Sequence, residues 1–365
     1  MIHVKDIASA MEEIAPLAYA EDFDNVGLLV GDYSDEVTGI LVTLDTTPEV
    51  VEEAIEKNCN LIVSFHPIIF SGLKKLNGKT YVEKAVMKAI KHGINIYATH
   101  TALDNSKVGV NFKISEQLKL LNTKILIPKS QTLKQLITYV PTENAEALKK
   151  ALYAAGAGEI GHYDSCGFSI EGNGNFRPIE GAHPFIGEIG KLETVNETRI
   201  EVVLPQHLES EIIDTLLKNH TYEEVAYSVI SLNNQNNYVG IGMIGELANE
   251  MDEMTFFNYL KIQMKTPVIR HSKLLNKKIK KVAVLGGSGA FGIRNAISAG
   301  ADIYITADLK YHDFFTAENK LVLADIGHFE SEQFTKNLIT SYLKEKFTNF
   351  VVFNSGINTN PVNYC

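Results

Sequence analysis

Cysteine is scarce in this chain of 365 residues, which contains only Cys59, Cys166 and Cys365. An odd number of widely spaced cysteines argues against a disulfide framework and indicates a reducing compartment, so we expect a cytoplasmic protein. No Cys-x-x-Cys pair occurs, which argues against a zinc site made of thiolates.

Long apolar runs are also absent. None approaches the roughly 20 residues that a membrane-spanning helix needs, so we expect no membrane partner. The N-terminal segment MIHVKDIASAMEEIAPL carries acidic residues where a signal peptide would have a basic segment and an apolar stretch. Its apolar residues recur every three to four positions, which predicts an amphipathic helix of the mature protein over Val4–Ile14.

Positive charge is in the minority, with 34 Lys and Arg against 44 Asp and Glu and a formal net charge of −10. This balance disfavours general attraction to nucleic acid, which we therefore do not expect as a partner. The one dense basic run, Lys277 to Lys281, precedes a strand-like segment and is interpreted as a solvated loop.

Signatures of a serine nucleophile are missing, because IGHYDSCG and LGGSGAF both lack the G-x-S-x-G spacing. The segment GGSG at Gly286–Gly289 joins a predicted strand to a predicted helix. Its backbone amides suit a phosphate at a helix N-terminus, but the lysine of a P-loop and a full dinucleotide fingerprint are absent. A plain tight turn is the alternative interpretation.

The order of predicted elements indicates an α/β protein. Residues 1–126 and 236–365 alternate strands with helices, and this alternation is typical of a layered α/β domain. The last predicted helix is a long one that begins at Phe329. Residues 127–235 follow the order strand, helix, strand, strand, helix, strand, which is the split βαβ or ferredoxin-like pattern. We therefore predict a bipartite layered α/β domain formed by the first and last segments, with an inserted α+β ferredoxin-like module between them.

Residue types that bind metals follow three of the predicted strands. His66 comes after LIVSF, His100 and Asp104 come after INIYA, and His328 and Glu332 come after LVLADIG. Each has a plainer interpretation as a loop, turn or capping residue. Because the carboxyl ends of parallel strands meet at one edge of a sheet, three such coincidences predict one metal site.

A fourth predicted strand lies in ITADLKYHDFF, which places Asp308, Lys310 and His312 near another strand end. These side chains either bind substrate or line the wall of a cleft.

Six segments together resemble a known family. EDFDNVGLLVG, SFHPIIF, ATHTALDN, GGSG, ITADLKYHDFF and ADIGHFESE occur in the order found in the GTP cyclohydrolase I type 2 homologues, also called dinuclear metal-centre proteins. The resemblance covers the first and last thirds of the chain. The middle third is similar to the ferredoxin-like module, related to nitrogen-regulatory signalling proteins, that some members carry.

The resemblance implies a set of metal ligands: His66, Asp104, His328 and Glu332. Phe65 stands where the family has the first of two adjacent histidines. By the family's pattern, His66, Asp104 and Glu332 hold one ion, and His328 with the bridging Glu332 holds a second. That second ion lacks one protein ligand and is expected to be weak or absent unless His100 substitutes.

The resemblance further implies a toroidal homohexamer that binds one or two divalent ions of zinc, manganese or iron. The implied activity is that of a metal-dependent hydrolase, opening the purine ring of a nucleotide such as GTP with metal-bound hydroxide. His100 and His312 are the expected proton carriers. The alternative is a ring-forming, metal-binding scaffold or regulatory protein without turnover.

Overall fold

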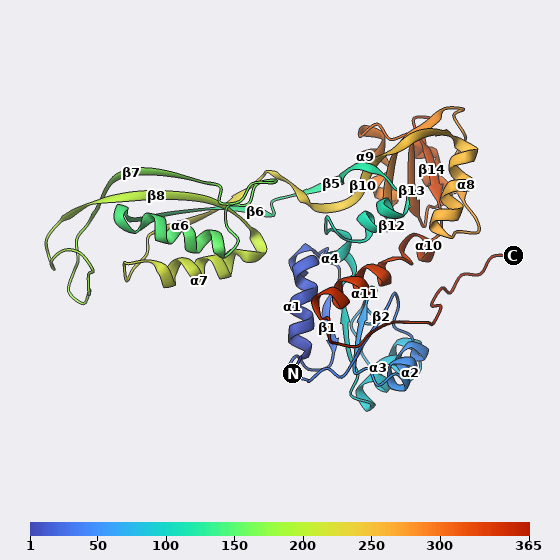
Figure 1. Ribbon diagram of the computed structural model, residues 1–365, viewed down its shortest axis with the longest axis horizontal. Coiled ribbons are helices and arrows are strands. Elements are labelled where there is room, and N and C mark those ends of the chain that lie inside the picture. Colours follow the sequence, from blue (N-terminus) through green and yellow to red (C-terminus); the bar gives the residue numbers. More distant parts are fainter. The chain divides into compact units, whose positions relative to one another are not determined.

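The computed structural model describes residues 1–365, which divide into two compact units. The first unit combines Met1–Pro128 with Tyr238–Cys365, and the second is Lys129–Asn237. The first unit contains two sheets and the second contains one (Figure 1).

The first sheet of the first unit has five strands in the order β1-β4-β3-β2-β15. Strands β15, β2, β3 and β4 are parallel, and β1 pairs antiparallel with β4. Every residue of β2, β3 and β4 is buried, so both faces of the sheet are covered, as is usual for parallel strands. The bounds are β1 (Gly27–Val30), β2 (Ile40–Thr43), β3 (Leu61–Ser64), β4 (Asn95–Ala98) and β15 (Val352–Asn354).

Four helices cover this sheet. Helices α2 (Pro48–Glu56) and α3 (Tyr81–Lys91) pack on one face, and α1 (Val4–Ile14) and α11 (Thr335–Lys346) pack on the other (Figure 1). The predicted first helix is confirmed with the same bounds. Threonine side chains cap α2 and α3 by accepting hydrogen bonds from backbone N–H groups of the first turn.

The second sheet has six strands in the order β11-β14-β13-β12-β10-β5, of which β12, β13 and β14 are parallel. The strands are β5 (Leu121–Ser130), β10 (Gln235–Asp252), β11 (Arg270–His271), β12 (Lys278–Ser288), β13 (Ile303–Ala307) and β14 (Val322–Asp325). The helices that contact this sheet are α5 (Val110–Gln117), α8 (Glu253–Met264), α9 (Ile293–Ser298), α10 (His328–Glu332) and the 3₁₀ helix η5 (Tyr311–Ala317). The short helix α4 (His100–Asp104) follows β4 and contacts α5.

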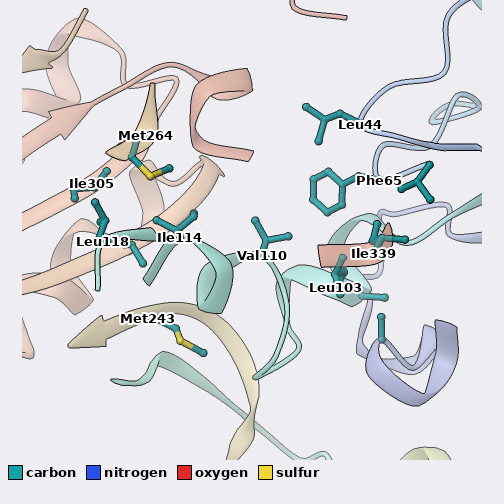
Figure 2. Close-up of a cluster of buried hydrophobic side chains, with 14 of the residues drawn as sticks. Leu44, Phe65, Leu103, Val110, Ile114, Leu118, Met243, Met264, Ile305 and Ile339 are labelled. Atoms are coloured by element: carbon teal, nitrogen blue, oxygen red, sulfur yellow. The ribbon is translucent and has the colours of Figure 1, made fainter. Parts of the chain in front are cut away.

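One hydrophobic core joins the two sheets of the first unit. Figure 2 shows Val110 of α5 between two groups of this core. Around Phe65 lie Leu44, Leu103 and Ile339, and around Ile114 lie Leu118, Met264 and Ile305. Helix α5 thus connects the two groups, and the core is continuous from one sheet to the other.

The prediction of one continuous helix from Phe329 is wrong, because the chain forms two helices there. The chain forms the short helix α10 and then α11, with Gln333 and Phe334 between them. The side-chain amide of Gln333 donates to the carbonyl oxygen of Met264 at 2.8 Å, which ties this junction to α8. The break allows α10 to lie at the end of β14 while α11 covers the first sheet.

The second unit has the element order predicted for it. Strand β6 (Leu133–Pro141), α6 (Ala145–Ala154), β7 (Gly167–Phe176), β8 (Glu193–Pro205), α7 (Glu209–Asn219) and β9 (Tyr227–Leu232) follow one another. The sheet is antiparallel in the order β7-β8-β6-β9. Its core lies between one sheet face and the two helices and includes Leu136, Leu148, Leu152, Ile200 and Ile212.

The α/β fold class predicted from the sequence is confirmed by these elements. None of the helices combines the length and the hydrophobicity that crossing a membrane requires.

Candidate metal centre

Three of the predicted ligands come together in the first unit. One ligand atom from each of His66, His328 and Glu332 lies within 4.8 Å of the others. His66 follows β3, whereas His328 and Glu332 are one turn apart on α10, which follows β14. Oxygen Oε2 of Glu332 lies 3.2 Å from Nε2 of each histidine. A single carboxylate oxygen therefore faces two imidazoles.

The two glycines near the end of β12, Gly286 and Gly287, make room for Glu332. A Cβ atom on Gly287, whose φ is +66°, would lie 2.4 Å from Oε1 of Glu332. The amide of Gly287 donates to the hydroxyl of Ser331, and the amide of Gly286 donates to the side-chain oxygen of Asn111, both at 2.9 Å. These two amides thus have protein partners, and the glycines make room for the carboxylate instead of offering their amides to a phosphate.

Each clustered histidine is oriented by a second carboxylate. Nδ1 of His66 lies 2.8 Å from Asp45, and Nδ1 of His328 lies 2.7 Å from Asp308. A carboxylate on Nδ1 keeps the proton on that nitrogen and leaves the Nε2 lone pair available to a metal. In both cases Nε2 is the atom that faces Glu332.

The charges of the cluster depend strongly on one another. Burial alone would lower the pKa of His66, but the negative charge of Glu332 and the hydrogen bond to Asp45 raise it to about 10. Burial likewise opposes charge on His328, while Asp308 and Glu332 raise its pKa to about 11. Without a metal ion, protons on the imidazoles balance the buried carboxylate. A divalent cation bound between the imidazoles and Glu332 would balance the negative charge of that carboxylate in the same way.

Asp104 lies near this cluster but is not one of its three close members. It is buried on α4, and burial together with the charge of Glu332 raises its pKa. Oxygen Oδ1 of Asp104 and Oε2 of Glu332 are both buried without a hydrogen-bond partner. Buried polar atoms normally have a partner, so two orphaned carboxylate oxygens beside two imidazoles fit a divalent cation.

His100 has the same kind of orientation as the clustered histidines. Its Nδ1 lies 2.7 Å from Asp24, whose side chain is fully buried. Burial would raise the pKa of Asp24, but hydrogen bonds from His100 and Thr101 lower it to about 2. The ring of His100 meets the ring of His66 edge-on, with centroids 5.4 Å apart. Its backbone φ of +27° is an uncommon conformation for a residue with a side chain.

Phe65 and His312 occupy different surroundings. Phe65 is fully buried in the shared core, with its ring 4.8 Å from His66 and 5.7 Å from His100 between centroids. His312 is exposed on η5, where its ring contacts Tyr311 and Phe315. Phe65 therefore places an apolar ring directly against the cluster.

A cavity of about 390 Å³ opens beside the cluster. Both clustered histidines line it, together with Asp45, Asp308 and Arg270. Residues 360–362 and Tyr364 also line it, and the Thr359 hydroxyl donates to Asp45 at 2.6 Å. The Asp45 carboxylate, which orients His66, is thus itself fixed by Thr359.

Sequence reasoning missed Asp24 and Asp45 as partners of the site histidines. Asp45 lies two residues after the end of β2, so the rule that selected His66 and His328 at strand ends could have selected it as well. Asp24 lies in a loop, within the segment EDFDNVG, and only its place in that segment marks it.

Comparison with known proteins shows the family to which the chain belongs. The Duf34/NIF3 family (NGG1p interacting factor 3) matches residues 2–361. The chain belongs to this family. A Bacillus subtilis strain 168 relative, named GTP cyclohydrolase 1 type 2 homolog, is 38% identical over 371 residues, covering 100% of this chain and 99% of the relative. A relative with the same name from Staphylococcus aureus strain Mu50 is 35% identical, covering 99% of each chain.

A solved structure of a NIF3-related protein shares the fold over its whole length. The crystal structure of a Bacillus cereus protein related to NIF3 superposes with a TM-score of 0.89 at 38% identity, covering 100% of this chain and 99% of that chain. The predicted resemblance to the GTP cyclohydrolase I type 2 homologues is therefore confirmed. This NIF3-family chain carries a group of two histidines and a glutamate that could hold a metal ion.

Proposed function

We propose that this chain is a metal-dependent hydrolase whose centre is held by His66, His328 and Glu332, with Asp104 beside them. One observation carries the proposal. A buried carboxylate oxygen, without a hydrogen-bond partner, lies 3.2 Å from two imidazole nitrogens that are both aimed at it by outer carboxylates. Imidazole and carboxylate ligands suit zinc, manganese and iron.

The geometry favours one ion over two. The same oxygen of Glu332 faces both histidines, so a single ion between the three side chains uses all of them. Phe65 offers no ligand atom, and its ring fills the space beside His66. A second ion would therefore have to rely on Asp104, His100 or solvent.

The protein's own residues have separable tasks in this proposal. A bound divalent ion lowers the pKa of a coordinated water toward neutrality. Asp45 and Asp308 keep the two imidazoles in the tautomer that presents Nε2. His100 is fixed by Asp24 through Nδ1, which leaves its Nε2 to take up and release a proton. We assign proton transfer to His100 in preference to His312, because the ring contacts of His312 are with Tyr311 and Phe315.

A purine nucleotide is the substrate class that we propose, because relatives at 35–38% identity are named GTP cyclohydrolase 1 type 2 homologs. The test incubates full-length protein, loaded separately with zinc, manganese or iron, with GTP, and measures formate and ring-opened product. Product formation that is lost on chelation is the expected result. No product with any of the metals would contradict the GTP reaction.

His328→Ala separates catalysis from a scaffolding role of the metal. A hydrolase predicts lost turnover with an unchanged molecular mass in solution. A metal-dependent scaffold predicts that the same change alters the mass of the assembly. Because His328 is 42% exposed, its replacement should disturb packing little, and His92→Ala, at an exposed histidine that follows α3, provides the matched control.

A further inference from the structure

A second cavity in the first unit, of about 680 Å³, lies along the edge strand β11 and the 3₁₀ helix η5. Its size falls within the range of roughly 300–1,000 Å³ that is usual for small-molecule sites. Its lining combines aromatic with basic side chains: Tyr311, Phe314 and Phe315 from η5, and Arg270, His271 and Lys273 from the segment of β11.

Two of the aromatic rings are unusually open to solvent. Tyr311 is 72% exposed and Phe315 is 65% exposed, although their centroids are only 5.5 Å apart. Isolated exposed apolar residues are common, but here the two exposed rings adjoin a cavity. Exposed rings of this kind offer a face on which another aromatic ring can stack.

The charge of the lining is opposite to that of the whole chain. The chain has a formal net charge of −10 with histidine counted as neutral. On the same count the lining has two positive side chains, Arg270 and Lys273, beside His271, and one negative side chain, Glu318. That carboxylate is already paired with Lys320 at 2.6 Å. The cavity therefore favours an anion, in contrast to most of the surface.

Arg270 is held rigidly at this place. Its guanidinium donates to Asp325 at 3.1 Å and to the carbonyl oxygen of Leu309 at 2.8 Å, and it lies over the ring of Phe314. More than half of its side chain is still exposed. Arg270 lines both this cavity and the cavity beside His66 and His328, so the two cavities adjoin through one side chain.

We propose that this cavity binds an aromatic anion of the size of a mononucleotide, with the ring on Tyr311 and Phe315 and the anionic group near Arg270 and Lys273. Three basic groups in a bounded cavity suit a single nucleotide better than a polymer, whose binding grooves follow many phosphates. Its use as a substrate subsite of the metal centre rests on the proposed function, whereas binding itself does not.

The experiment measures binding by titration calorimetry to full-length, chelator-treated protein, which isolates this site from the metal. The probes are GMP, guanosine and inorganic phosphate. We expect GMP to bind at least about tenfold more tightly than either fragment. Tyr311→Ala and Phe315→Ala should each weaken GMP binding by roughly 5- to 150-fold, the range for loss of one stacking contact. Lys273→Gln should weaken it less and reduce its dependence on salt.

Matched controls come from similar side chains elsewhere. Tyr163→Ala removes a ring that is 76% exposed in the second unit, and Lys277→Gln removes an exposed lysine; both should leave GMP affinity unchanged. The proposal is overturned if GMP does not bind, or if Tyr311→Ala and Phe315→Ala leave its affinity intact. It is also overturned if an oligonucleotide binds more tightly per nucleotide, or if these variants instead change the mass of the protein in solution.

The two proposals fail in different ways. GMP binding that survives while metal-loaded protein shows no turnover would contradict only the hydrolase. Turnover of GTP that is unaffected by Tyr311→Ala and Phe315→Ala, with no GMP binding to metal-free protein, would contradict only the stacking site.

Discussion

The site histidines of the first unit and a half-buried histidine of the second unit have different partners. In the first unit, His66, His100 and His328 each have Nδ1 within 2.8 Å of an aspartate oxygen. In the second unit, His220 instead donates through Nε2 to the carbonyl oxygen of Tyr139, and burial lowers its pKa. Carboxylate partners therefore distinguish the candidate metal ligands from a histidine that only joins two segments.

The sheets of the two units also differ in burial. Strands β2, β3 and β14 of the first unit are buried along their whole length, so polar side chains at their ends lie in a largely desolvated place. Nearly every residue of β7 in the second unit is exposed. A charged group needs a charged or hydrogen-bonding partner when it loses water, and at the site histidines of the first unit the aspartates supply it.

The strongest way to break this comparison is Glu332→Gln. The change removes the buried charge that both histidines face, so metal affinity should fall by more than the roughly 10–100-fold that changes to outer partners produce. Titration of zinc into chelator-treated protein measures the loss. Glu345→Gln, at an exposed glutamate of α11, should bind zinc as the unaltered protein does, and equal affinities of the two variants would contradict the site.

Phe65→His sharpens the comparison by adding a ligand type where the chain has none. We expect bound metal to rise from one ion to two per chain, because the new imidazole would adjoin His66. Metal analysis of protein purified without chelator measures the ratio. Phe70→His, at a half-exposed ring near His100, is the control and should leave one ion. Two ions in the unaltered protein would refute the single-ion proposal.

Leu148→Ala tests whether the second unit is independent of the metal centre. Leu148 is buried in the core between the helices and the sheet of that unit, so its truncation should cost about 2–5 kcal/mol of local stability. Hydrogen exchange of α6 and β6 reports that loss, and zinc affinity should stay unchanged. Leu217→Ala, at a largely exposed position on α7, should change exchange little. A parallel fall in zinc affinity would show that the units are coupled.

Asp45→Asn and Asp308→Asn have the smallest expected effects. Each keeps the shape of the side chain but removes the charge that orients one imidazole, so zinc affinity should fall by about 10–100-fold. Asp214→Asn, an exposed position in the second unit, is the matched control. Affinities indistinguishable from that control would mean that these carboxylates do not support the site.

The sequence predicted those features of the fold that depend on a single helix or strand. The spacing of apolar residues predicted α1 with its bounds, and the strand, helix and turn order predicted an α/β protein. The helix from Phe329 was predicted too long, because the tie between Gln333 and α8 is a tertiary contact. Asp24 escaped attention for the same reason, since its partner His100 is 76 residues away.

By itself the sequence determined which residue types end the buried strands, because strand-forming runs and the polar residues after them are local features. It also determined that Phe65 stands before His66. Only the tertiary structure decided that His66 and His328 share one oxygen of Glu332 and that separate aspartates orient each imidazole. Those distances depend on how the shared core packs two sheets together, and no local pattern encodes that packing.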